Sequence, residues 1–242
     1  MFKFEKLVFG DLGWGDEFLF ATLMTITVSI LSMGLGLCLA IITVWAKLIT
    51  NKITRFIANF YTTVVRGVPE LLVIYLIFFG GNSVVMSIAK LFGYNGYIEL
   101  NALTIGTIAI AFISATYSSE VLRAAYLAVN KGQIEAAKAL GLNKIQIFFK
   151  VMGPQILRHA LPGIGNVWQI TLKDTSLISV TGLVEIMRQT RIASNVEHSP
   201  LTFLVTAAFL YLFLTTFSGK FFKVLELNYS KGYNQCKIFY SI

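Results

Sequence analysis

Residues 18–46 read FLFATLMTITVSILSMGLGLCLAIITVWA, and none of these side chains is charged. An α-helix rises about 1.5 Å per residue, so this stretch is longer than the ~30 Å hydrocarbon core of a bilayer. Gly34 and Gly36 lie within it and would let a second helix approach closely. The stretch therefore predicts a first membrane-spanning helix.

The composition of the whole chain excludes a soluble globular fold. Of its 242 residues, 56% are hydrophobic and only 13% are charged, about half the usual charged share of a soluble domain. The apolar residues also occur in long blocks rather than at the spacing of a one-sided helix or strand. Lipid is therefore the expected solvent for most of this surface.

Four further apolar stretches follow, at about 56–79, 102–129, 161–183 and 200–219. We expect the second to be interrupted at Arg66–Glu70 and to end at the Gly80-Gly81-Asn82 sequence. Residues 83–100 are only weakly apolar, and we expect an outer loop there with one short interfacial helix. The sequence thus predicts an all-α membrane protein with about five transmembrane helices, folded as a single domain over residues 1–242.

The charges predict the orientation of these helices. The net charge is +8, but the basic residues lie between apolar blocks, which suits an anionic lipid surface and not nucleic acid. Lysine and arginine are concentrated in the segments that follow the first, third and fifth spans. By the positive-inside rule these segments are cytoplasmic. The N-terminus is then outside and the C-terminus is in the cytoplasm.

The longest polar segment between spans carries a distinctive pattern. Residues 131–163 read KGQIEAAKALGLNKIQIFFKVMGPQILRHALPG. The alanine-rich part, 133–140, favours a helix, and Gly141 is well placed as the left-handed residue that ends it. Asn143 is a suitable N-cap for a second helix that begins at Lys144. The result is a helix–glycine–helix elbow with an apolar surface and charged edges, able to lie on the membrane or to press into a groove on a soluble partner.

The elbow resembles the "EAA" loop of the permeases of binding-protein-dependent ABC importers. Four other motifs resemble those of the polar amino-acid branch of that family. They are Arg66-Gly67-Val68-Pro69, Tyr117-Ser118-Ser119-Glu120-Val121-Leu122-Arg123, Lys131-Gly132-Gln133 and Leu172-Lys173-Asp174-Thr175-Ser176-Leu177. The resemblance covers roughly residues 15–230. Glu70, directly after Pro69, resembles the Q-type subunits of basic amino-acid and opine permeases.

This resemblance implies a type I ABC importer permease fold in the bacterial inner membrane. The chain would translocate amino acids, polar or basic, without a cofactor or chemistry of its own. Its expected partners are a sister permease or a second copy, two cytoplasmic ATP-binding subunits, and a periplasmic or lipid-anchored binding protein. The ATP-binding subunits would dock on the coupling loop, 130–160, and the residues expected there are Glu135, Ala136, Ala137, Leu140, Gly141 and Ile145. The sequence contains no GxxxxGK[ST] phosphate loop, so ATP hydrolysis is expected on another chain.

Ionisable side chains inside the membrane are the candidates for the substrate path, because each costs about 2.5–3.5 kcal/mol to insert. Glu120 could contact substrate or pair with Arg123, and Asp174 could contact substrate or cap a break in the fourth helix. Two such carboxylates in one cavity would favour a cationic amino acid. Arg66 could line the path or bond to carbonyls freed at a kink, and Glu70 could pair with it. The full candidate set is Glu120, Asp174, Ser119, Thr175, Ser176, Glu70 and Arg66.

Other functional classes fit the sequence less well. A secondary transporter or channel would show inverted repeats and no docking loop. A membrane enzyme would need a clustered nucleophile, paired catalytic carboxylates or a metal set, and His159 and His198 lie at ends of spans with no partner ligand. Five helices are too few to enclose a path, so a homodimer or heterodimer is expected. The Q-type resemblance favours a heterodimer.

Overall fold

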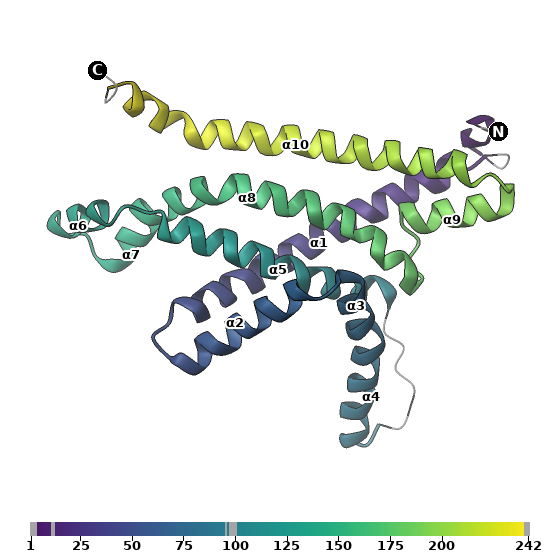
Figure 1. Cartoon of the computed structure of the whole chain (residues 1–242), viewed down its shortest axis with the longest axis horizontal. Helices are drawn as coiled ribbons and strands as arrows, with labels where there is room; N and C mark the ends of the chain where they lie inside the picture. The colour runs from purple at the N-terminus through teal and green to yellow at the C-terminus, as the bar shows by residue number, and fades with distance from the viewer. Residues whose placement is uncertain (1–3, 11–12, 95, 97–100, 240–242) are drawn as a thin grey trace.

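The computed structural model describes residues 4–10, 13–94, 96 and 101–239, which are helical throughout apart from short connections. Four helices run lengthwise through the molecule (Figure 1). They are α1 (Gly15–Leu48), α5 (Ala102–Leu127), α8 (Gly153–Asp174) and α10 (Pro200–Phe239). The others are α2 (Lys52–Gly67), α3 (Glu70–Tyr75), α4 (Gly81–Leu91), α6 (Lys131–Ala139), α7 (Lys144–Ile147) and α9 (Ile186–Glu197). The all-α prediction is confirmed.

The largest contact between two helices joins α1 and α5. Gly36 permits it, because a Cβ at this position would overlap Ser114 Oγ and lie 3.1 Å from the Ala111 carbonyl oxygen. One turn earlier, Ser32 Oγ donates to the Thr107 carbonyl oxygen at 3.1 Å. The expectation for Gly36 is therefore confirmed. The same expectation was wrong for Gly34, because a Cβ added there would have no neighbouring atom within 4 Å.

The second expected span is divided differently from the prediction. Helix α2 ends at Gly67, and Val68 is extended (ψ 155°) because the following proline excludes the helical conformation there. A new helical run begins at Glu70 and continues through a π-helical turn, Leu76–Gly80, into α4. The glycines at 80 and 81 adopt ordinary right-handed helical angles. The predicted helix end at residues 80–82, and a loop beginning at 83, were therefore wrong.

In Figure 1, α4 points away from the other helices. Little of the Glu70–Leu91 run is buried within the chain. Part of the expected outer loop, residues 95 and 97–100, lies outside the described residues. The α3–α4 run therefore forms an arm whose apolar surface is left to lipid or to another subunit.

Four helices of the described part are long and apolar enough to cross a membrane: Gly15–Leu48, Glu70–Leu91, Ala102–Leu127 and Pro200–Tyr229. The expected fourth span, 161–183, is formed by α8 and a following 3-10 segment, Thr175–Thr181 (η4). It carries Lys173 and Asp174, which lower its hydropathy. It nevertheless lies against α5 and α10. The predicted break in this helix does occur at Asp174.

The elbow forms as the sequence predicts. Gly141 follows α6 with φ +78°, and the Asn143 side chain accepts a hydrogen bond from the Gln146 backbone N–H at 2.9 Å. Leu140 and Ile145 are 81% and 70% exposed. From Lys144 the chain stays helical through α7, a π-helical turn at Phe148–Met152, and α8. The elbow is therefore joined to Asp174 by one continuous helical run.

Candidate functional site

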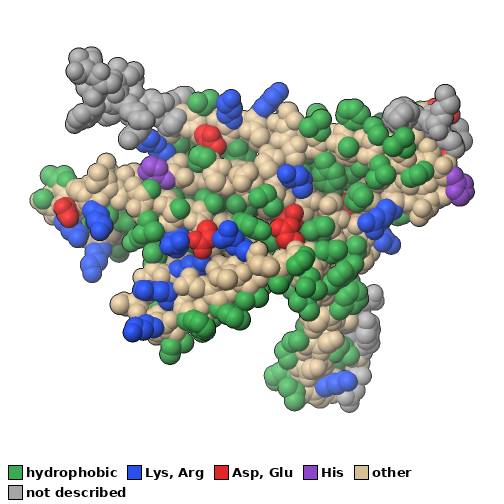
Figure 2. All heavy atoms as spheres, viewed as in Figure 1, with side chains coloured by type: hydrophobic (Ala, Val, Ile, Leu, Met, Phe, Trp, Pro, Cys, Tyr) green, Lys and Arg blue, Asp and Glu red, His purple; other side chains and the backbone are tan. Residues whose placement is uncertain are grey.

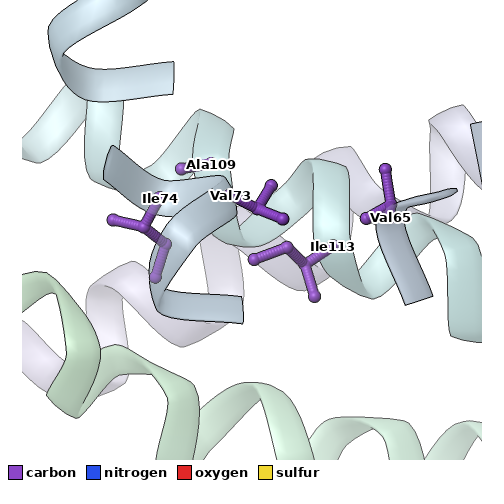
Figure 3. Packing of buried hydrophobic residues seen from close by; sticks show 5 residues of the cluster. All are labelled: Val65, Val73, Ile74, Ala109 and Ile113. Atoms are coloured by element: carbon purple, nitrogen blue, oxygen red, sulfur yellow. The ribbon is translucent and has the colours of Figure 1, made fainter. Parts of the chain in front are cut away.

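The α2–α3 break is held against α5 by a small apolar cluster. Figure 3 shows Val65 of α2, Val73 and Ile74 of α3, and Ala109 and Ile113 of α5 packed together. All five are buried. This packing fixes the polar residues between them, from Arg66 to Glu70, beside the middle of α5.

A cavity of about 490 Å³ opens next to this break, where α1, α2 and α5 meet. It is lined almost entirely by polar and charged side chains. They are Lys47, Asn59, Thr62, Thr63, Arg66, Tyr117 and Glu120, together with Gly67. Figure 2 shows acidic and basic side chains side by side on the face where α2 crosses the bundle. The cavity can therefore hold a polar molecule that carries charges of both signs.

Lys47 is the one charged residue of the cavity wall that was not among the candidates, because it directly follows the expected first span. Its side chain is 3% exposed. The ammonium donates to Thr62 Oγ1 at 2.7 Å and forms an ion pair with Glu120. Lys47 lies on the same face of α1 as the buried residues Gly36, Ala40 and Thr43. That helical spacing was the one signal that could have placed it inside.

Glu120 connects two cations. Arg123 Nε donates to its Oε2 at 3.1 Å, so the expected local pair with Arg123 is present. The ion pair with Lys47 uses the other oxygen. The Glu120 carboxylate is thus neutralised by residues of α1 and α5, and it is 28% exposed. In this structure it joins the two helices at the cavity wall.

Tyr117 connects Arg66 with Glu70. The Arg66 guanidinium lies over the Tyr117 ring, 5.4 Å from its centroid, and the Tyr117 hydroxyl donates to Glu70 Oε1 at 3.0 Å. In the described part of the chain, Arg66 and Glu70 form no ion pair, so the predicted pairing was wrong. The break at Val68 and Pro69 removes the helical turn that would bring residues four apart together.

Asp174 lies beside Glu70 instead of beside Glu120. Its carboxyl lies close enough to that of Glu70 for the two groups to interact, and its side chain does not cap η4. The expectation of a capping Asp174 was therefore wrong. Asp174 also does not line the cavity next to Glu120, so the condition of two carboxylates in one cavity is not met there. Within the described residues, neither Glu70 nor Asp174 forms an ion pair with a cation.

The three candidates that carry a hydroxyl group are less available to a substrate. Ser119 and Thr175 are fully buried and donate to carbonyl oxygens of their own helical segments, at Thr116 and Leu172, both at 2.8 Å. Ser176 is half-buried. Of the residues that the sequence singled out, Arg66 and Glu120 line the cavity. Glu70 and Asp174 lie together beside it, and Tyr117 connects Glu70 to the cavity wall.

A second polar junction lies beyond η4. Glu185 is fully buried and caps α9, accepting from the backbone N–H groups of Met187 at 2.9 Å and Arg188 at 2.8 Å. It also accepts from the Tyr211 hydroxyl of α10 at 2.9 Å. Burial raises the pKa of the Glu185 carboxyl above its ordinary value, against the opposing effect of these hydrogen bonds. Glu185 thus ties α9 to α10.

The chain is similar to permeases of known transport systems. It is 47% identical over 227 residues to the nopaline transport system permease protein of Agrobacterium fabrum, and the match covers 93% of this chain and 96% of the relative. It is 44% identical over 228 residues to the octopine transport system permease protein of Rhizobium radiobacter, covering 94% and 96%. The histidine/lysine/arginine/ornithine transport system permease protein of Escherichia coli is 36% identical over 220 residues, covering 91% and 96%.

A similar fold is found in the crystal structure of an amino acid ABC transporter with histidines. The TM-score is 0.75 at 27% sequence identity, and the match covers 89% of this chain and 95% of that one. This confirms the type I permease fold. The family described as "Binding-protein-dependent transport system inner membrane component" matches residues 32–229. Such permeases work with separate ATP-binding subunits and a substrate-binding protein. The chain therefore belongs to the inner membrane components of binding-protein-dependent transport systems.

Proposed function

We propose that this permease imports amino acids that carry a basic group, of the arginine, lysine or opine type. The observation that supports this most directly is the adjacent pair of carboxyls, Glu70 and Asp174, with no cation paired to either among the described residues. Two acidic groups side by side attract a positive charge strongly in a low-dielectric region. A basic side chain of a substrate supplies that charge.

The rest of the site suits the other end of an amino acid. Arg66 is exposed at the cavity and is positioned over Tyr117. A guanidinium is the usual partner of a carboxylate, because its fork of donors matches the two oxygens. An arginine-like or opine substrate would place its carboxylate at Arg66 and its cationic group toward Glu70 and Asp174. The opine transporters among the relatives agree with this assignment.

The uptake experiment uses the complete importer in vesicles, with its ATP-binding subunits and binding protein. Asp174→Asn and Glu70→Gln should each reduce uptake of an arginine-type substrate at least about tenfold, the effect of about 1.4 kcal/mol. Uptake of a neutral amino acid should change much less. Glu226→Gln, on α10 away from the site, is the matched control. Equal losses for cationic and neutral substrates would refute the assignment.

We further propose that residues 1–242 form one permease domain, with the N-terminus outside and the C-terminus cytoplasmic. A second permease, favoured as a sister subunit, completes the path, and two ATP-binding subunits dock on the coupling loop. A phosphatase fused after Lys90 should be active if the orientation is correct. An inactive fusion that is stably produced would exclude this orientation.

The docking surface would consist of exposed parts of the elbow around Glu135, Ala136, Leu140, Gly141 and Ile145, with the buried Ala137 anchoring it. Gly141→Asp forces a side chain into a left-handed position and adds a charge to this surface. We expect the ATP-binding subunit to be lost from the purified complex. Gly182→Asp imposes the same backbone strain (φ +98°) away from the elbow and should retain it. Retention by both variants would contradict the docking proposal.

A further inference from the structure

A second cavity, of about 490 Å³, lies between the elbow and the α1–α5 pair. One wall is a strip of residues spaced four apart along the continuous run of α7 and α8: Lys144, Phe148, Met152 and Ile156. The other wall comes from the last turns of α1, including Ile41 and Trp45, and from Leu122 and Tyr126 of α5. All of these are apolar or aromatic except Lys144. The cavity is therefore a groove with an apolar lining and one positively charged side chain.

The charge lies at one end of the groove. Lys144 is the first residue of the strip, and Ile156 is the last. Twelve residues of helix correspond to about 18 Å. The groove is thus long enough to lie along part of an acyl chain, and its lysine marks the end next to the polar elbow.

The groove also lies beside the last turns of α1, at the end of the stretch that we expect to span the membrane. Ile41 and Trp45 belong to the charge-free stretch of α1, and Trp45 is 65% exposed. The polar residues that follow Leu48 mark the membrane boundary, where tryptophan is enriched. An apolar groove beside the end of a membrane-spanning helix has a lipid acyl chain as a suitable ligand.

We propose that this groove binds one anionic phospholipid, with an acyl chain along the Phe148–Ile156 strip and the headgroup phosphate at Lys144. Basic side chains gather at this end of the molecule (Figure 2), which favours an anionic over a zwitterionic headgroup. The two walls belong to different parts of the fold, so the lipid would join the coupling elbow to α1 and α5. This inference goes beyond the proposed transport function and does not depend on the substrate.

The test uses the complete importer in phosphatidylcholine vesicles. The vesicles contain a small, equal fraction of either phosphatidylglycerol or phosphatidylcholine with a photoactivatable group in the acyl chain. Crosslinked peptides are identified by mass spectrometry. We expect phosphatidylglycerol to label residues 41–49 and 148–156 about fivefold more than phosphatidylcholine, the effect of about 1 kcal/mol for one lysine near an anionic group.

Variants distinguish the groove from general surface binding. Lys144→Gln should abolish the preference for phosphatidylglycerol, whereas Lys150→Gln, at an exposed lysine of the same run that does not line the groove, should keep it. Val44→Phe partly fills the groove and should reduce labelling by both lipids. No labelling by either lipid would show that protein covers the groove. That result, equal labelling by the two lipids, or an unchanged preference in Lys144→Gln would overturn the proposal.

Discussion

The ion pair between Lys47 and Glu120 allows a quantitative prediction. Removing one partner of a fully buried pair costs about 3–5 kcal/mol. In Lys47→Met, the remaining Glu120 is 28% exposed and keeps Arg123, itself 43% exposed. We therefore expect a smaller loss, about 2 kcal/mol. Glu120→Gln leaves the 3%-exposed Lys47 with neutral acceptors but without its counter-charge, and we expect about 3 kcal/mol.

The two substitutions together should be less harmful than their sum, since no charge is then left without its partner. We expect a coupling energy of at least about 1.5 kcal/mol in the double-mutant cycle. Thermal unfolding of the purified importer measures it. For a chain of this size Lys47→Met should lower the midpoint by about 4–8 °C. Lys52→Met, at an exposed lysine of α2, is the control. Additive losses, or a neutral Lys47→Met, would show that the pair contributes nothing to the fold.

Three further predictions follow from other contacts. Gly36→Val should separate α1 from α5, because a Cβ at this position overlaps Ser114, and should lower the stability measured by thermal unfolding by about 1–3 kcal/mol. Gly34→Val, whose Cβ lies in open space, should not lower it. Equal effects of the two substitutions would contradict the packing. Tyr117→Phe removes the hydroxyl that donates to Glu70. It should raise the KM for uptake of a cationic substrate up to about tenfold, which corresponds to about 1.4 kcal/mol. An unchanged KM would count against the site. The buried Glu185 keeps its proton to higher pH in the folded state than in the unfolded state, so stability should fall as the pH rises above the ordinary pKa of 4.5. Glu185→Gln should flatten this decline when unfolding is measured as a function of pH. An identical slope in the variant would refute the role of Glu185.

The parts of the fold that local signals determine were predictable. The elbow depends on Gly141 and Asn143, whose conformations follow from residue type at a helix end, and both were found as expected. The adjacent glycines at 80 and 81 do not end the helix as predicted, because a helix in the membrane retains its hydrogen bonds when no water competes for them. Local rules for soluble helix ends therefore overestimated the effect of these glycines.

The site was predictable only in part, because it is assembled by tertiary packing. The sequence singled out Glu70, Glu120 and Asp174 as unusual charges within apolar stretches. It could not show that Asp174 meets Glu70 of α3, since that depends on where the break after Arg66 directs the chain. The burial of Lys47 likewise depends on how α1 packs against α2 and α5.

The continuous helical run from Lys144 to Asp174 has a consequence for how this family can diverge. One residue inserted or deleted in a helix rotates everything beyond it by about 100°. Such a change anywhere in the run would turn Asp174 away from Glu70, or turn the Lys144–Ile156 strip away from α1, even if every side chain were conserved. Natural variation between the elbow and Asp174 should therefore consist of substitutions at constant length. Insertions and deletions should accumulate outside this run.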